Sequence, residues 1–195
     1  MTRSDARQNR QLIMQAFHKA TREERAHLPT MSEIVTLSGL GRGTVYRHFP
    51  DVGALSFSFM AEGYEALFTE SRTALNNAKN KEETFAALKD HMQRYRAFTH
   101  QHLYLLTTPE CKTSDGYALA HKSQRQCVRR AFRDLANLGK SSPPLLDAAV
   151  DLIARAADPE HLHACGVNQN APDRDAEADI EMALDLTREL LKRFQ

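Results

Sequence analysis

The chain has 195 residues, enough for one domain or for a small domain joined to a larger one. Charged residues make up 26% of the chain and hydrophobic residues 42%, a balance that is typical of a folded protein and excludes a disordered one. No apolar run is long enough to span a bilayer, and the first residues lack the apolar core of a signal peptide. We therefore expect a cytoplasmic protein with no membrane partner.

The net charge of +1 is unevenly distributed. Residues 1–55 carry eight Lys and Arg against five Asp and Glu, whereas the rest of the chain carries 18 against 20. A basic head on a mildly acidic body is typical of a DNA-contacting module carried by a second domain.

The first three predicted helices lie close together in sequence, and the second and third are short. Apolar residues recur at helical spacing within residues 4–20. Thr30 and Glu33 have the spacing of a capping box, and Gly39 tolerates the left-handed conformation that ends a helix, so a second helix is predicted between them. A third helix is predicted from Gly41 to Phe49, before Pro50.

The remainder of the chain also has helical periodicity. A long helix is predicted after Asp51, and further helices within residues 81–106, 117–138, 145–157 and 175–194. Residues 158–174 are predicted to form an irregular loop. Because no strand-like alternation is present, the predicted fold class is all-α, with eight or nine helices. We expect an N-terminal three-helix domain at residues 1–55 and a larger helical domain at residues 56–195.

The second and third helices predict a helix-turn-helix, whose second helix lies in the major groove of DNA. Leu40, Val45 and Phe49 are expected to pack inward. Gly43 lets the backbone approach DNA, the arginines can bind guanine or phosphate, and the hydroxyl groups suit phosphate oxygens. The predicted DNA-binding residues are Thr30, Arg42, Gly43, Thr44, Tyr46, Arg47 and His48.

A phosphate-binding loop is the alternative for the glycines in "GLGRG". The segment has no preceding strand and no Gly-Lys-Ser/Thr ending, so neither nucleotide-binding fingerprint fits. The pattern favours the helix-turn-helix.

The segment from Thr30 to Leu55 resembles the DNA-binding domain of the TetR family of transcriptional regulators. The matching residues are Ile34, Gly39, Leu40, Gly43, Thr44, Val45, Tyr46, His48, Phe49 and Leu55. The resemblance implies an all-α homodimer whose larger domain binds a small-molecule effector and dimerises through its last two long helices. It also implies a repressor that occupies a palindromic operator and leaves the double-stranded DNA when the effector binds.

Three positions depart from the family pattern. Gly41 stands where a capping Ser or Thr is frequent, and glycine is the weaker cap. The segment Asp51–Gly53 lacks a lysine that commonly meets a phosphate. Thr36 and Leu37 replace small residues at the crossing of the two short helices.

Aromatic and sulfur-containing residues of the larger domain are candidates for an effector pocket, because pockets between helices are mostly apolar. For each of them a place in the packed core is the alternative. The candidate ligand-binding residues are Phe59, Tyr64, Phe68, Met92, Tyr95, Phe98, His102 and Tyr117. The apolar stripe at residues 180–194 can likewise form either core or a dimer surface.

Other chemistry has little support in the sequence. The histidines and Cys165 have no metal-site spacing, and no nucleophile and base are paired, so we expect no metal, no cofactor and no enzyme. Cys127 lies among arginines that can lower a thiol pKa, although a structural role is favoured. A ligand-independent regulator with a filled core, and an enzyme, remain the alternatives to a ligand-controlled repressor.

Overall fold

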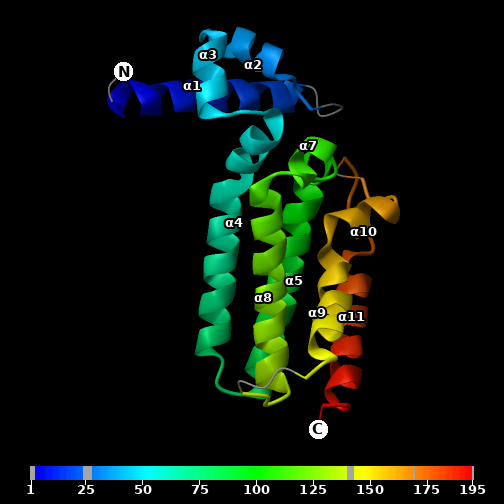
Figure 1. Cartoon of the computed structure of the whole chain (residues 1–195). Helices are drawn as coiled ribbons and strands as arrows, with labels where there is room; N and C mark the ends of the chain where they lie inside the picture. The colour runs from blue at the N-terminus through cyan, green and yellow to red at the C-terminus, as the bar shows by residue number, and fades with distance from the viewer. Residues whose placement is uncertain (1–2, 24–27, 140–142, 169, 195) are drawn as a thin grey trace. The chain divides into compact units, whose positions relative to one another are not determined.

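The computed structural model describes residues 3–23, 28–139, 143–168 and 170–194. All regular structure in these ranges is helical, which confirms the predicted all-α class (Figure 1). The elements are α1 (Arg3–Glu23), α2 (Met31–Ser38), α3 (Arg42–His48), α4 (Val52–Asn77), α5 (Lys81–Gln101), α6 (Leu103–Leu106), α7 (Pro109–Lys112), α8 (Asp115–Leu135), α9 (Leu146–Ala154), the 3-10 helix η1 (Arg155–Ala157), α10 (Pro159–Ala164) and α11 (Ala176–Leu191). No helix in these ranges is long and apolar enough to cross a membrane.

Short helices account for the difference from the predicted eight or nine. The helices α6, α7 and α10 have four to six residues each. The helix α10 lies in a segment that we predicted to be irregular, so that prediction was wrong for residues 159–164. Asp158 explains the helix start, because its Oδ1 accepts hydrogen bonds from the backbone N–H of Glu160 at 2.8 Å and of His161 at 3.3 Å. Pro159 is also well suited to a first helical position.

The chain divides into two compact units. Unit 1 comprises the residues up to Glu62 together with Tyr104–Ala118, and unit 2 comprises Gly63–Leu103 and the residues from Leu119 onward. The division falls inside α4, a few residues beyond the domain boundary proposed from the sequence at residue 55.

The first helices of unit 1 form a small core with the predicted caps. The side chains of Ile13, Phe17, Ile34, Val45 and Leu55 are fully buried. The Thr30 Oγ1 accepts a hydrogen bond from the Glu33 N–H at 3.3 Å, while the Glu33 carboxylate accepts one from the Thr30 N–H at 2.6 Å. This arrangement is the predicted capping box. Gly39 ends α2 with φ of 68°, as predicted.

Unit 1 also contains the segment that bears α7. A Cβ atom on Gly53 of α4 would overlap the backbone carbonyl of Glu110, and one on Gly116 of α8 would overlap the ring of Phe57. Glycine at these two positions therefore permits close packing of residues 104–118 on the first turns of α4.

Unit 2 is built around α5. In Figure 1 the helices α4, α5 and α8 run side by side, and α9 lies beside α11. The stripe on α11 is buried inside this unit, with Ile180, Leu184 and Leu191 at most 7% exposed. This stripe therefore belongs to the core of the single chain.

A buried arginine of α5 holds the segment before α11 and the first turn of α11 in place. Arg96 on α5 is 1% exposed, and its Nε and Nη2 donate to the two carboxylate oxygens of Asp173 at 2.7 and 3.0 Å. Its Nη1 lies 2.7 Å from an oxygen of Asp179 and also donates to the Ala156 carbonyl. The hydrogen bonds from Arg96 lower the pKa of Asp173. This cluster links α5, η1 and the start of α11 by charge-assisted hydrogen bonds.

Candidate nucleic-acid interface and effector cavity

The helix α3 presents two different faces. Val45 on α3 and Phe49 just after it are at most 3% exposed and pack into the core of unit 1. The remaining side of the helix is open, with Arg42, Gly43, Tyr46 and Arg47 exposed and Thr44 and His48 half-buried. These are the residues that the sequence predicted to face outward, and their contact with DNA stays a prediction.

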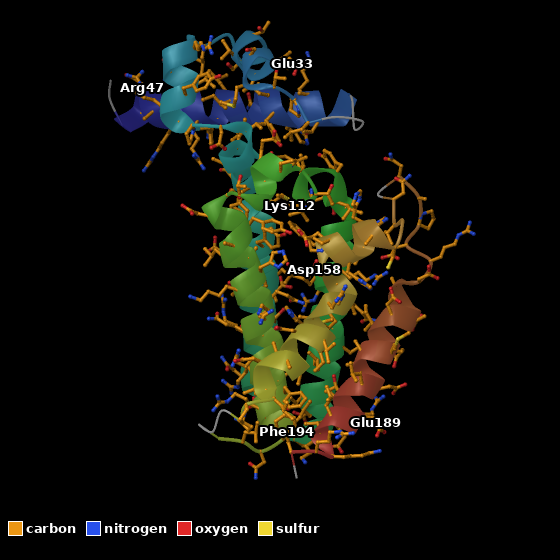
Figure 2. All side chains as sticks on the ribbon, turned by 45° about the vertical axis from the view of Figure 1, so that its right-hand side comes forward. Glu33, Arg47, Lys112, Asp158, Glu189 and Phe194 are labelled. Carbon is orange, nitrogen blue, oxygen red and sulfur yellow. The ribbon has the colours of Figure 1, made fainter. Side chains whose placement is uncertain are left out.

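The polar side chains of α3 are loosely tethered to each other. The Arg42 guanidinium lies 5.2 Å from the centre of the Tyr46 ring, and Arg47 Nη2 donates to Thr44 Oγ1 at 3.3 Å. Figure 2 labels Arg47 on α3. No carboxylate lies within ion-pair distance of either arginine among the residues that the structure describes. Both guanidinium groups can therefore bind an anion without first breaking an ion pair.

Gly43 has no structural purpose inside the chain. A Cβ atom at this position would meet no atom of the described residues within 4 Å, and the backbone is helical. A glycine in a helix costs about 0.5–1 kcal/mol relative to alanine. The open space above Gly43 is consistent with a partner that approaches the backbone of α3.

The start of α3 is weakly capped. Gly41 is the N-cap and makes no side-chain hydrogen bond to the helix. This confirms that Gly41 occupies the cap position, where glycine is generally a weaker cap than Ser or Thr.

Thr30 is more occupied than the sequence indicated. Its hydroxyl donates to Glu33 Oε2 at 2.8 Å and also accepts from the Glu33 N–H. Glu33, labelled in Figure 2, therefore places a carboxylate at the N-terminus of α2. The Thr30 hydroxyl can donate to a phosphate only after it gives up its bond to Glu33.

Arg10 is a residue of the interface region that the sequence did not single out. Its guanidinium lies 4.7 Å from the centre of the Phe49 ring, and its Nη2 donates to Ser58 Oγ at 2.5 Å. Arg10 thus braces the residue that ends α3 against α1 and α4. Arg10 therefore supports the packing of unit 1, a role that charge counting alone does not distinguish from DNA contact.

Most of the predicted effector residues pack against each other within unit 2. The rings of Tyr64 and Phe98 lie 4.6 Å apart, and those of Phe98 and His102 also 4.6 Å apart. Phe68 and Tyr95 lie 6.0 Å apart. Met92 is fully buried beside this aromatic cluster. For these residues the alternative of a packed core describes the structure better than an open pocket does.

Two predicted effector residues lie in unit 1. Phe59 packs on Phe17 with ring centres 5.4 Å apart and lines a surface groove between α1 and α4. Tyr117 is half-buried on the first turns of α8. These two residues thus belong to a different compact unit from the aromatic cluster.

Unit 2 contains a cavity of about 440 Å³ with a polar lining. We call it the polar cavity. Its lining residues are Tyr95, His121, Gln124, Arg125, Asp151, Ala154, Arg155, Asp158, Glu160, His161 and Ala164. Tyr95 is the one predicted effector residue among them. Sequence reasoning missed the others because it searched for apolar residues, and because they come from four separate elements.

A buried hydrogen-bond chain leads from this cavity to α4. Gln124, 4% exposed, accepts a hydrogen bond through Oε1 from His91 Nε2 at 2.5 Å, and His91 Nδ1 lies 2.8 Å from Ser71 Oγ. Burial lowers the pKa of His91 to about 4. His91 is therefore neutral at pH 7 and relays hydrogen bonds between α8 and α4.

The charges around the polar cavity are mostly paired. Arg125 forms an ion pair with Asp151, and His121 Nδ1 lies 3.5 Å from Asp158 Oδ2. Burial lowers the pKa of His121 despite the nearby carboxylate. Figure 2 labels Asp158, which also caps α10.

The cysteine thiols of the core are protonated. Burial raises the pKa of Cys127 to about 11, and Arg72 opposes this shift only weakly. The suggestion that arginines lower the pKa of Cys127 was therefore wrong, because desolvation outweighs their charge. The structural role of this cysteine is favoured.

Comparison with known proteins supports the class of fold. A crystal structure of a Mesorhizobium loti protein, provisionally assigned to the TetR family of transcriptional regulators, superposes with a TM-score of 0.60. The superposition covers 97% of this chain and 98% of that protein, at 17% sequence identity. The chain therefore has the fold of a TetR-family regulator, with a helix-turn-helix formed by α2 and α3.

Curated relatives are similar over part of the chain. HTH-type transcriptional regulators of Staphylococcus aureus strains USA300, NCTC 8325 and COL are each 28% identical to it over 94 residues. The match covers 48% of this chain and 51% of each relative, so the chain spans about half the length of the curated relatives it matches. No protein-family model matches the chain.

Proposed function

We propose that this protein is a DNA-binding transcriptional regulator of the TetR family, working in the cytoplasm as a repressor. The helix α3 inserts into the major groove. There Arg42 and Arg47 bind base edges or phosphates, and the hydroxyl groups of Thr44 and Tyr46 bind phosphate oxygens. His48 and Thr30 lie at the margin of this contact.

The observation that carries this proposal is the bare backbone of α3 at Gly43. An exposed helical position where glycine is needed for neither conformation nor internal packing indicates an external surface that comes close. Two guanidinium groups flank it, neither of them paired with a carboxylate of the described part of the chain, as expected for a surface that binds a polyanion.

We propose that the protein acts as a homodimer on a palindromic operator. Two copies of α3 would then occupy half-sites about one helical turn apart, roughly 34 Å. The stripe on α11 that the sequence offered for dimerisation is buried in the single chain. Three large apolar side chains on packed helices of unit 2 remain exposed, Leu119 of α8 (61%), Leu152 of α9 (52%) and Met182 of α11 (67%). Leu152 and Met182 lie on the two of these helices that contact each other. They are the candidate centre of the dimer surface.

Release of DNA by a small-molecule effector is the remaining part of the proposal. The polar cavity of unit 2 supports it, because its volume lies within the range of small-molecule sites. The packed aromatic cluster supports the second candidate, a regulator that needs no ligand. An effector that releases the protein from DNA distinguishes the two.

In vitro selection from a random duplex library, with the full chain as bait, tests DNA binding. Fluorescence anisotropy then compares the selected duplex with a scrambled one at several salt concentrations. Arg42→Ala should lower affinity and alter sequence preference, whereas Tyr46→Phe should lower affinity equally on all sequences. Arg193→Ala, at an exposed position just after α11, is the matched control and should bind as the wild type does. Failure to enrich any sequence would contradict the proposal.

A further inference from the structure

Two hydrogen-bond donor groups line the polar cavity and have only weak partners within the described part of the protein. Gln124 lies on its buried wall, and among the residues that the structure describes the acceptor for its Nε2 is the thioether sulfur of Met92 at 3.6 Å. A thioether is a weak acceptor, so a buried amide N–H there has much of its hydrogen-bonding capacity unspent.

Arg155 is the second such group. It lines the same cavity from η1, and no carboxylate lies within ion-pair distance of it among the residues that the structure describes. The other arginine of the cavity, Arg125, is paired with Asp151. Arg155 is therefore the cationic group with capacity for an anion.

The carboxylates of the cavity are engaged. Asp151 is paired with Arg125, and Asp158 accepts two backbone hydrogen bonds and lies near His121. Glu160 also takes part in an interaction within the protein. The groups left to recognise a ligand are thus donors, which favours a ligand that brings acceptors.

The number of charges limits the ligand further. Three carboxylates and two guanidinium groups line the cavity, and burial keeps His121 neutral at pH 7. This net negative lining opposes an anion in proportion to its charge, so it disfavours a multiply charged anion most, whereas a single negative charge is opposed least and can pair with Arg155 at short range.

We propose that the polar cavity binds a small organic monocarboxylate, held by the guanidinium of Arg155 and the side-chain amide of Gln124. The carboxylate would be the effector, so the regulatory meaning of this inference rests on the proposed function. His91 is hydrogen-bonded to both Gln124 and Ser71, so it connects the occupied cavity to α4. The first turns of α4 belong to unit 1.

Thermal denaturation of the full chain tests the site without DNA. The probes are monocarboxylates of three to nine carbons, each measured beside the uncharged amide and the amine of the same skeleton, with inorganic phosphate as a further probe. A bound carboxylate at ten times its Kd should raise Tm by about 3–6 °C. If no carboxylate raises Tm more than its amide, amine or phosphate comparison does, the proposal is wrong.

Variants assign the effect to the cavity. Arg155→Gln should abolish the Tm rise given by the carboxylate, whereas Arg193→Gln should leave it unchanged. Gln124→Glu keeps the shape of the side chain and an acceptor for His91, and its negative charge should also abolish the rise. A rise that survives in folded Arg155→Gln protein would overturn the assignment.

The link to α4 is tested with the selected duplex. The stabilising carboxylate should release wild-type protein from this DNA, and Ser71→Ala should keep the Tm rise but lose the release. Release that is unchanged in Ser71→Ala would overturn the coupling through His91. A chain that binds carboxylate but no DNA would contradict the proposed function while supporting the carboxylate site.

Discussion

Substitution of Gly43 by alanine should change the stability of the protein and its affinity for DNA in opposite directions. The added methyl group meets no atom within 4 Å in the part of the chain that the structure describes, and the backbone at this position is already helical. Alanine should therefore stabilise α3 by about 0.5–1 kcal/mol, near the lower end because the position is close to the helix start. The same methyl group would project from the face that we assign to DNA.

The expected effect on DNA is a loss of affinity. If the backbone of α3 comes close to the duplex, the methyl group must push the two surfaces apart or displace a hydrogen bond, and we expect at least about a tenfold loss, which corresponds to about 1.4 kcal/mol. Urea denaturation measures the stability, and fluorescence anisotropy with the selected duplex measures Kd.

Gly39→Ala is the matched control for this prediction. Gly39 has φ of 68°, where alanine is strained, so this variant should lose roughly 1–2 kcal/mol of stability. Its DNA affinity should stay near that of the wild type at temperatures where it is folded. A Gly43→Ala protein that is more stable and binds DNA as tightly as the wild type would refute the close approach at α3.

Three further outcomes follow from the structure. Gly41→Ser supplies the missing cap of α3 and should raise stability by a few tenths of a kcal/mol in urea denaturation, with no gain if the serine cannot reach the helix N–H groups. The pKa of His91 falls from 6.5 to about 4 on folding, so below pH 6.5 the unfolded chain takes up a proton that the folded protein does not. The free energy of unfolding should therefore fall between pH 6.5 and pH 4, by up to about 1.4 kcal/mol per pH unit. His91→Gln should flatten this slope in denaturation curves taken across that range. Met182→Glu and Leu152→Glu should each give a monomer by light scattering with helical content unchanged, whereas a dimer that persists in both would exclude this surface.

Local signals in the sequence predicted the helix-turn-helix in detail. The Thr30–Glu33 capping box, the left-handed Gly39 and the inward Val45 and Phe49 are all present in the structure. Each depends on residues within a few positions of each other, so spacing along the chain is enough to identify them.

The effector site could not be predicted in the same way. Aromatic residues at helical spacing can fill a core or line a pocket, and the choice depends on how helices far apart in sequence pack. Here Tyr64 contacts both Phe68 and Phe98, while the cavity lies among charged residues of α8, α9, η1 and α10. The helix α10 itself was missed, although Asp158 and Pro159 are a recognisable start signal.

The burial of a charged side chain could not be predicted from the sequence either. From the sequence alone Arg96 is expected at the surface of α5, as arginines usually are. In the structure it is 1% exposed and paired with Asp173 from a distant segment. The stripe on α11 had two possible partners, a second copy or the same chain. The structure shows that α5 and α9 of the same chain cover it.

The most direct test of DNA recognition by α3 is methylation interference on the selected duplex. Methylation of guanine N7 blocks contacts in the major groove. We predict interference in two patches about one helical turn apart, related by the symmetry of the operator, with the patches weakened in Arg42→Ala. Binding that is insensitive to guanine methylation would contradict the placement of α3 in the major groove.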